Sequence, residues 1–349
     1  MTIFFKYPLF FVSVLWDFIT RVRNFLYDKK LFRVHTFLSV QTVVVGNLTV
    51  GGTGKTPHVC YLLERLAYLK DVGVLSRGYN RKTRGFIALQ DIQPSVETVG
   101  DEMIQYFYWT QAQKITPYLY VGENRPEAIR KILQRPYRPI ILLLDDGFQH
   151  RALQANLYIL LSDFHRLFTD DFLMPYGNLR ESPCQAKRAH IVLITKTPFF
   201  ISEDKKQEIC QKVAKYTAAP VFFTALEYGE LQPIFGDWQT TCLPKTIGLL
   251  TSIANAESLT SYLIEKQVNI IEHFRFPDHY YFKKQDIQNL LRFYQQNSAP
   301  ILCTFKDAVK LFSFTELSSV PIAYIPVKVV FLGHEIKFWE TFYKYIYIK

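Results

Sequence analysis

A glycine-rich stretch near position 50 contains residues whose types and spacing could bind phosphate. The glycines would let backbone N–H groups turn toward phosphate oxygens, Lys55 would reach the β- and γ-phosphates, and the Thr56 hydroxyl would bind Mg²⁺. The pattern for such loops begins with glycine, whereas this chain has Thr49; a glycine-rich turn without a ligand is the alternative. The expected nucleotide-binding residues are Thr49, Val50, Gly51, Gly52, Thr53, Gly54, Lys55 and Thr56.

The segments on both sides of this stretch favour the phosphate-binding interpretation. Three valines at 43–45 are typical of a buried parallel strand. Pro57 would open a helix, because the apolar residues at 59, 62, 63 and 66 have helical spacing. A strand, a glycine loop and a helix, in that order, are the context that a phosphate-binding loop requires.

A second motif ends another apolar run. Residues 139–144 are apolar and lead into Asp145 and Asp146. Such a run predicts a buried strand whose terminal carboxylate faces the phosphate loop and holds Mg²⁺ directly or through water. The pattern is common by itself, but its distance from the glycine loop strengthens it.

Two polar segments follow elements expected between these motifs. Residues 77–84 carry four cations after a predicted strand at 72–75, where open parallel sheets bind ligands. A solvated loop is the alternative. Asp101 and Glu102 open a predicted helix over 103–111, where two acids could serve catalysis or simply favour the helix dipole.

A third polar site is predicted much later in the chain. His279 follows Asp278 where a strand predicted at 270–276 runs into a turn. The pair could be a general base or a group that orients one. An isolated Asp-His pair is weak support for either role.

The first 33 residues form an aromatic segment that turns basic. Their longest uncharged run, 7–16, is too short to span a bilayer, and no small-residue cleavage site follows it. A helix lying in a membrane interface fits this pattern, with cations near anionic headgroups. An ordinary amphipathic helix packed on the core is the alternative.

Composition limits the class of protein. Hydrophobic residues make up 49% and charged residues 21%, as in a globular protein, and 349 residues suffice for two domains. The net charge of +10 suggests an acidic partner, and five scattered cysteines argue for a reducing compartment. No arginine-rich helix or aromatic RNA-binding signature supports nucleic-acid binding.

The order of predicted elements indicates an α/β fold with two α/β/α domains. We expect a membrane-associated amphipathic helix at 1–35 and a P-loop NTPase-type parallel sheet at 36–228. A polar stretch rich in glycine and proline would then lead into a second α/β domain at 229–349 with a C-terminal helix.

Together these motifs resemble the tetraacyldisaccharide 4′-kinase family over nearly the whole chain. The quoted segments are 46–57, 76–79, 100–102, 145–150, 278–279 and the lysine-aspartate segment 304–310. Threonine at position 49 is itself a trait of that family. The chain departs from the family at Asn80 and Ala152, which bears on substrate contacts and not on the reaction.

The resemblance implies transfer of the ATP γ-phosphoryl group to the 4′-hydroxyl of an acylated disaccharide 1-phosphate, forming lipid IVA in lipid A biosynthesis. It implies Asp101 as the base, assisted by His279, with Lys55 stabilising charge on the phosphates. Mg²⁺ would be held by a set of four residues: Thr56, Glu102, Asp145 and Asp146. The glycolipid would be bound by another set: Asn47, Arg77, Tyr79, Gln149 and His150.

Further expectations concern partners and location. The resemblance implies a peripheral enzyme, expected to be a monomer, on the cytoplasmic face of the inner membrane of a Gram-negative-type bacterium, with no nucleic-acid partner. The rival class is a membrane-surface ATPase switch of the partitioning type. Those proteins carry a lysine just before the first glycine pair of the loop, where this chain has Val50.

Overall fold

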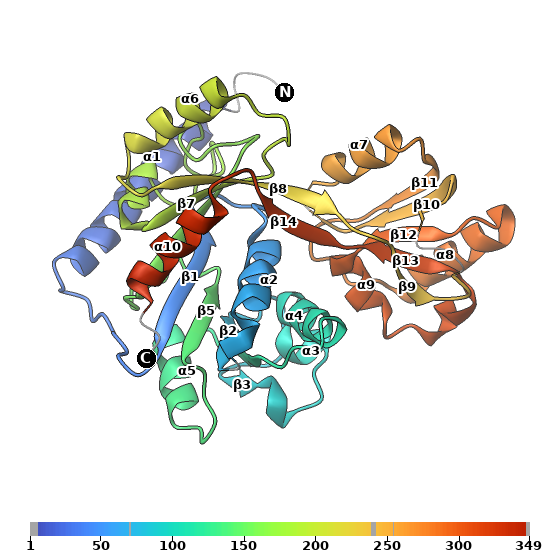
Figure 1. Cartoon of the computed structure of the whole chain (residues 1–349), viewed down its shortest axis with the longest axis horizontal. Coiled ribbons are helices and arrows are strands. Elements are labelled where there is room, and N and C mark those ends of the chain that lie inside the picture. The colour runs from blue at the N-terminus through green and yellow to red at the C-terminus, as the bar shows by residue number, and fades with distance from the viewer. Residues whose placement is uncertain (1–5, 70, 239–241, 254, 347–349) are drawn as a thin grey trace.

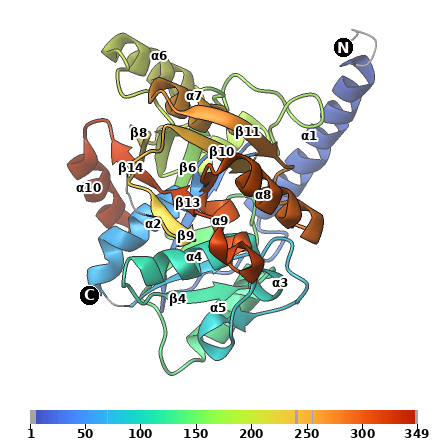
Figure 2. The same ribbon diagram turned by 90° about the vertical axis from the view of Figure 1, so that its right-hand side faces the viewer.

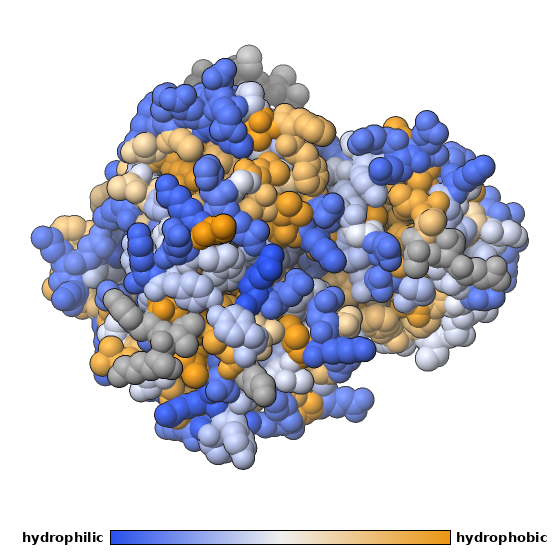
Figure 3. Space-filling model, viewed as in Figure 1, coloured by the Kyte–Doolittle hydropathy of each residue, from blue (hydrophilic) through white to orange (hydrophobic). Residues whose placement is uncertain are grey.

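The computed structural model describes residues 6–69, 71–238, 242–253 and 255–346. Figure 1 shows a larger lobe built around one sheet and a smaller lobe built around a second sheet, joined by the long strands β8 (Val221–Tyr228) and β14 (Val327–Phe331). Turned by 90°, the chain shows the smaller lobe in front of the larger one (Figure 2). The face seen in Figure 3 is mostly hydrophilic, with hydrophobic residues in separate patches on both lobes.

The larger lobe contains a nine-stranded sheet in the order β14-β8-β7-β6-β1-β5-β2-β4-β3. Its strands are parallel except for the two edge strands β3 and β14, each antiparallel to its neighbour. Its remaining strands are β1 (Gln41–Asn47), β2 (Val72–Ser76), β3 (Ile87–Ala88), β4 (Tyr118–Val121), β5 (Ile141–Asp145), β6 (Leu157–Asp163) and β7 (Ile191–Thr195). Its helices are α1 (Lys6–Asp28), α2 (Lys55–Leu66), α3 (Val96–Val99), α4 (Asp101–Ala112), α5 (Arg125–Leu133), α6 (Glu203–Ala214) and α10 (Glu335–Tyr345).

The centre of this sheet places the two phosphate-site motifs side by side. β1 lies between β5 and β6, and Val45 on β1 is in register with Asp145 on β5. Every residue of β5 is buried, as the continuous apolar run predicts for a parallel strand covered on both faces. The glycine loop after β1 and the paired aspartates therefore meet at the carboxyl edge of the sheet, where such sheets bind ligands.

The smaller lobe contains a five-stranded sheet in the order β11-β10-β12-β13-β9. Its strands are β9 (Gln232–Phe235), β10 (Thr246–Thr251), β11 (Asn269–Arg275), β12 (Ile301–Thr304) and β13 (Ile322–Ile325). Its helices are α7 (Glu257–Glu265), α8 (Lys284–Asn297) and α9 (Phe305–Leu311). The last of these, α9, faces α4 of the larger lobe, so the two lobes meet next to Asp101.

Two sequence-based assignments are wrong at the end of the chain and in the supposed linker. β14 and α10 do not belong to the second domain expected at 229–349, because β14 pairs with β8 and α10 buries Phe338 and Phe342 in the core of the larger lobe. Within the polar stretch expected to link the two domains, residues 232–235 form β9, an edge strand antiparallel to β13. Its Pro233 is tolerated there because an edge strand has one unpaired side.

The N-terminal helix α1 lies on the larger lobe with polar side chains turned inward. Ser13, Thr20 and Asn24 are buried, whereas Phe11 is 74% and Phe18 65% exposed. The inward contacts are specific: Ser13 Oγ donates to the carbonyl of Leu173 over 2.9 Å. In the part of the chain that the structure describes, no helix is both long enough and apolar enough to cross a membrane.

Candidate active site

The glycine loop forms a compact turn between β1 and α2. Gly54 adopts a φ of +83° immediately before α2, a conformation that favours glycine, and Lys55 and Thr56 are the first two residues of the helix. The loop carbonyls are held from outside, since Arg166 donates to the Val50 carbonyl over 2.7 Å and the Thr195 hydroxyl to the Thr53 carbonyl over 2.9 Å. A fixed loop before a helix N-terminus has the geometry that the predicted phosphate-binding site requires.

Lys55 lies between the loop and the paired aspartates. Its Nζ is 3.4 Å from Asn47 Oδ1 and 3.5 Å from Asp146 Oδ1. Arg180 binds the same carboxylate, with its Nη1 3.0 Å from Asp146 Oδ2. Burial alone would raise the pKa of Asp146, but the charges of Lys55 and Arg180 lower it to about 2. Asp146 is therefore ionised and holds Lys55 at the mouth of the loop.

The neighbouring Asp145 is fully buried and only partly satisfied. Its Oδ2 accepts a hydrogen bond from the Tyr106 hydroxyl over 2.9 Å, whereas its Oδ1 is buried without a partner among the described residues. Burial raises its pKa above the usual range. Burial, followed by the charges of Asp145 and Asp146, also raises the pKa of Glu102 to about 7. Three clustered acids with an orphaned oxygen form an environment that a cation would stabilise.

Arg125 lies next to this acidic cluster and contacts it through the backbone of Asp145. It is fully buried and donates to the Leu75 carbonyl at the end of β2 over 2.8 Å and to the Asp145 carbonyl at the end of β5. The guanidinium thus clamps the ends of two neighbouring strands and offsets the carboxylate charges. A planar fork with several donors can serve two carbonyls at once, which an ammonium cannot do with the same geometry.

We expect Arg125→Lys and Arg125→Met to lower stability by about 2–4 kcal/mol, because charge-assisted hydrogen bonds at buried sites contribute roughly 1.5–3 kcal/mol each. Urea unfolding followed by circular dichroism would measure the shift in midpoint. The exposed Arg84, which has no ion-pair partner among the described residues, offers the matched control Arg84→Lys. Unchanged midpoints in both Arg125 variants would contradict the clamp.

Asp101 and His279 meet across the boundary between the lobes. Asp101 is the first residue of α4, and its Oδ2 lies 2.6 Å from His279 Nδ1, although the two residues are 178 positions apart. Gly100 before it has a φ of +84°, and a Cβ there would lie 2.6 Å from the Tyr79 carbonyl oxygen. Glycine at position 100 is what lets α4 start this close to the segment after β2.

The environment of Asp101 keeps it ionised. Burial alone would raise its pKa, but the hydrogen bond from His279 and the charges of Lys306 and Lys310 bring the pKa below its usual value. Its second oxygen, Oδ1, is buried and has no hydrogen-bond partner within the described ranges. The arrangement leaves one carboxylate oxygen able to accept a proton or a hydrogen bond from an added group.

Two of the four cations in the basic segment after β2 are already paired with carboxylates of the protein, so fewer remain for a ligand. Arg81 has an almost fully buried side chain bound to Glu123, and Lys82 is 2.6 Å from Glu97. Arg77 is exposed and forms no ion pair with any described residue. Tyr79 is 50% exposed and packs on the His279 ring at 5.0 Å. Arg77, Tyr79 and the exposed Arg84 are thus members of this segment that could meet a ligand.

Of the three remaining predicted ligand-binding residues, Asn47 and Gln149 lie at the start of the phosphate loop. Asn47 is fully buried, and its carbonyl accepts a hydrogen bond from Gln149 over 2.6 Å. His150 is half-buried, and burial, followed by the charges of Arg125 and Arg77, lowers its pKa to about 4. The neutral His150 therefore lies near Arg77, whereas Asn47 and Gln149 hold the loop in shape.

Several residues that contact this site were missed from the sequence. Tyr106, Arg125 and Arg180 touch the acids, and Lys196 binds the Gly52 carbonyl together with Asp163. No local pattern indicated them, because each reaches the site through the fold. Lys306 belongs to the segment 304–310, which resembles the family, but the sequence assigned it no role. Its Nζ lies 3.7 Å from Asp101 Oδ2.

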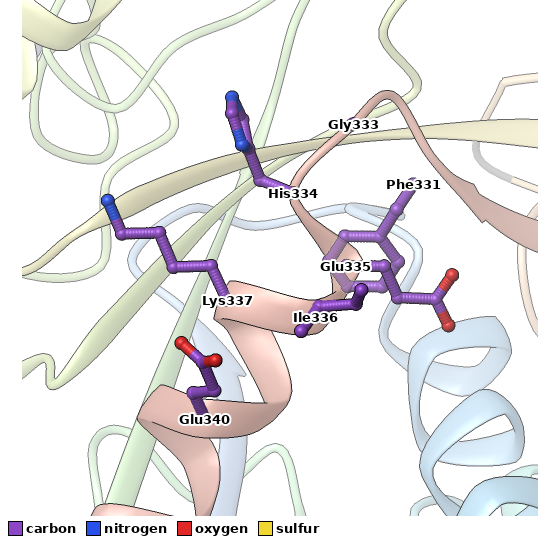
Figure 4. A pocket seen from close by; sticks show the side chains of 7 residues that line it. All are labelled: Phe331, Gly333, His334, Glu335, Ile336, Lys337 and Glu340. Carbon is purple, nitrogen blue, oxygen red and sulfur yellow. The ribbon is translucent and has the colours of Figure 1, made fainter.

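A pocket of about 590 Å³ lies elsewhere, at the start of α10. Figure 4 shows its lining, with the Glu335 side chain directed toward α2. None of the predicted site residues lines it. Glu335 there accepts a hydrogen bond from Tyr61 over 2.6 Å, which ties α10 to α2. The candidate active site is thus defined by converging polar groups and not by this hollow.

The parallel sheet, the glycine loop before α2 and the paired aspartates at the end of β5 define a protein of the P-loop class. A family model described as tetraacyldisaccharide-1-P 4′-kinase matches residues 5–347. The chain belongs to this family.

Its relatives match it over nearly their full length. A tetraacyldisaccharide 4′-kinase of Flavobacterium psychrophilum is 37% identical and covers 98% of this chain and 97% of its own. One of Cytophaga hutchinsonii is 39% identical over 88% of this chain and 86% of its own. Among solved structures, the chain is similar to the "apo" form of LpxK from Aquifex aeolicus in complex with ATP, with 28% sequence identity and a TM-score of 0.74. The match covers 98% of this chain and 100% of that one.

Proposed function

We propose that the protein transfers the γ-phosphoryl group of ATP to the 4′-hydroxyl of a tetraacyldisaccharide 1-phosphate, forming lipid IVA in lipid A biosynthesis. Membership of the family supports the reaction, and the solved relative was crystallised with ATP. The observation that carries the proposal is the Asp101–His279 pair, formed between the lobes beside the acids that follow β5. A phosphate loop alone would serve an ATPase equally well, whereas this pair offers a base for a hydroxyl acceptor.

The residues divide the reaction between positioning and charge. Lys55 would bind the β- and γ-phosphates, and the amides of the loop would hold the phosphate chain. The free Oδ1 of Asp101 would accept the hydrogen bond of the sugar hydroxyl while His279 occupies Oδ2. A loose transition state for phosphoryl transfer needs little early deprotonation, so an ionised, well-oriented carboxylate suffices.

The acids fit a Mg²⁺ ion that arrives with ATP. Among the described residues no group of three or more His, Cys, Asp or Glu forms a ready-made metal site, so Glu102, Asp145 and Asp146 are not a closed ligand set. Mg²⁺ usually takes one or two protein ligands and completes its shell with phosphate oxygens and water. Thr56 and the orphaned Oδ1 of Asp145 would hold it, with Glu102 and Asp146 nearby; the ion would neutralise charge on the phosphates.

We further propose that α1 holds the protein against an anionic membrane surface, where an acylated substrate resides. Its outward face exposes Phe11, Leu15 and Phe18, whereas its buried polar side chains face the larger lobe, as Ser13 does in its contact with Leu173. Arg21 lies in α1, and Lys29 directly follows the helix. Cations at these positions would be attracted to anionic headgroups. An ordinary packed helix would show the opposite distribution, with the apolar side chains buried.

We expect the double variant Phe11→Ser/Phe18→Ser to reduce partitioning onto vesicles that contain anionic lipid by about a hundredfold or more, since each buried phenylalanine contributes about 1.5–3 kcal/mol. Cosedimentation at low and high salt would measure the change. Phe200, fully exposed on the loop after β7, provides the matched control Phe200→Ser. Deletion of residues 1–20 should likewise release most of the protein and leave salt-sensitive binding; complete retention in high salt would contradict the proposal.

Mass spectrometry provides the test of the reaction. A tetraacyl disaccharide 1-phosphate incubated with the protein and Mg-ATP should gain one phosphate. Hydrolysis of ATP without modification of the glycolipid would refute the kinase assignment and favour a membrane-surface ATPase switch.

A further inference from the structure

Lys306 lies at the centre of the contact between the lobes, with its side chain directed at the Asp101–His279 pair. It is the second residue of α9, and its side chain is 19% exposed. Its Nζ lies 2.8 Å from Asp278 Oδ1, 3.3 Å from His279 Nε2 and 3.7 Å from Asp101 Oδ2. One ammonium group thus contacts three side chains that include both members of the pair.

The contact with His279 determines which ring nitrogen carries the proton. An ammonium group only donates hydrogen bonds, so Nε2, which faces Lys306, must present its lone pair. Nδ1 then carries the hydrogen and donates it to Asp101 over 2.6 Å. We propose that Lys306 is a positioning residue that fixes the Nδ1–H tautomer of His279 and thereby the orientation of Asp101. This inference rests on the proposed function of that pair.

A competing carboxylate makes the position of Lys306 consequential. Asp278 Oδ2 is 3.7 Å from His279 Nε2, so this carboxylate would accept a hydrogen bond from a protonated Nε2 if Lys306 did not occupy the site. The ring would then lie between the carboxylates of Asp101 and Asp278, which only accept hydrogen bonds, so each carboxylate would find a partner only if both ring nitrogens carried a hydrogen. Tyr79 also packs on the ring, with the two ring centroids 5.0 Å apart.

The backbone that carries Lys306 is held by a separate buried network. Thr304 Oγ1 is 2.7 Å from Asp307 Oδ2, and Asp307 accepts hydrogen bonds from the backbone N–H and hydroxyl of Ser252. Lys310 donates to the Ser252 hydroxyl over 2.7 Å. This network joins the start of α9 to the end of β10 without using the Lys306 side chain. Substitution of Lys306 therefore removes the contacts with the pair and leaves the support of α9 in place.

The experiment compares Lys306→Met with Lys306→Arg and with Lys284→Met, an exposed lysine of the same lobe as the control. With the glycolipid and Mg-ATP, we expect kcat of Lys306→Met to fall by roughly tenfold to a hundredfold, as small displacements of catalytic groups do. KM for ATP should be unchanged. Arginine, which also only donates, should restore most of kcat, and Lys284→Met should match the wild type.

A spectroscopic measurement tests the tautomer without any substrate. In protein labelled with ¹⁵N-histidine, with His279→Gln used to assign the signal, the wild-type ring should show a protonated Nδ1 and an unprotonated Nε2. Lys306→Met should move the signal to the doubly protonated ring, because both ring nitrogens would then face a carboxylate. Lys306→Met/Asp278→Asn should move it back, because the competing carboxylate is gone. Melting temperatures of all variants should stay within a few degrees of the wild type.

The outcomes separate this proposal from the proposed function. An Nε2–H ring in the wild type, or an unchanged ring in Lys306→Met, would overturn the role of Lys306 even if the protein phosphorylates the glycolipid. A changed ring with unchanged kcat would also overturn it. If the glycolipid gains no phosphate, the proposed function fails, while the measurement on the ring still decides whether Lys306 fixes the tautomer.

Discussion

Lys55→Ala should lower the rate of glycolipid phosphorylation by about a thousandfold, and Thr56→Ala should also cause a large loss, while both variants stay folded. Lys55 acts on charge that develops in the transition state, and removal of one such preorganised donor costs roughly 3–4 kcal/mol. Asp146 keeps its contact with Arg180 when Lys55 is gone, so the melting temperature should change little. Steady-state kinetics by phosphate transfer from labelled ATP would measure the loss.

Lys215, an exposed lysine that follows α6, serves as the control through Lys215→Ala and should show wild-type rates. A Lys55→Ala enzyme with a near-wild-type rate would refute the phosphate-loop assignment. A loss of rate accompanied by unfolding would show that Lys55 serves the fold, and circular dichroism distinguishes the two results.

Asp101→Ala, His279→Ala and the double variant should all fall to similar low rates, about a hundredfold to ten-thousandfold below the wild type, which is the range for a general base. The reason is the 2.6 Å hydrogen bond, which makes one functional unit of the two side chains. Apparent affinity for ATP should change little, because neither residue belongs to the phosphate loop. A double-mutant cycle on kcat and KM measures the coupling between the two losses.

The exposed His165 provides the matched control, and His165→Ala should retain the wild-type rate. A double variant whose loss equals the product of the single losses would show that Asp101 and His279 act independently. That result would also remove the basis for assigning a positioning role to Lys306.

The glycine loop and the paired aspartates could be predicted from local sequence, because each motif lies in one short segment at the end of a strand. The valine run predicts a buried strand, the glycines permit the turn, and the helix begins where the chain has Lys55 and Thr56. Asp145 ends β5 as the apolar run predicts, and parallel strands of one sheet bring their carboxyl ends to one edge. The two motifs could therefore be placed together from the sequence.

Other parts of the site depend on which elements pack together, and periodicity does not contain that information. The pattern of β14 suits either sheet, and only pairing with β8 and burial of Phe338 place the C-terminal segment on the larger lobe. The two faces of α1 are visible in the sequence, but which face the protein covers is a tertiary property; here it covers the polar one.

The sequence by itself predicted the residues that we propose contact phosphate and, through its resemblance to a family, singled out Asp101 and His279. Only the tertiary structure decided that Arg180 holds Asp146, that Tyr106 and Arg125 hold Asp145, and that Lys306 faces His279. The physical reason is that each of these contacts joins different elements. Hydrogen bonds of this kind form only after the sheet order and the contact between α4 and α9 bring the side chains within 3–4 Å.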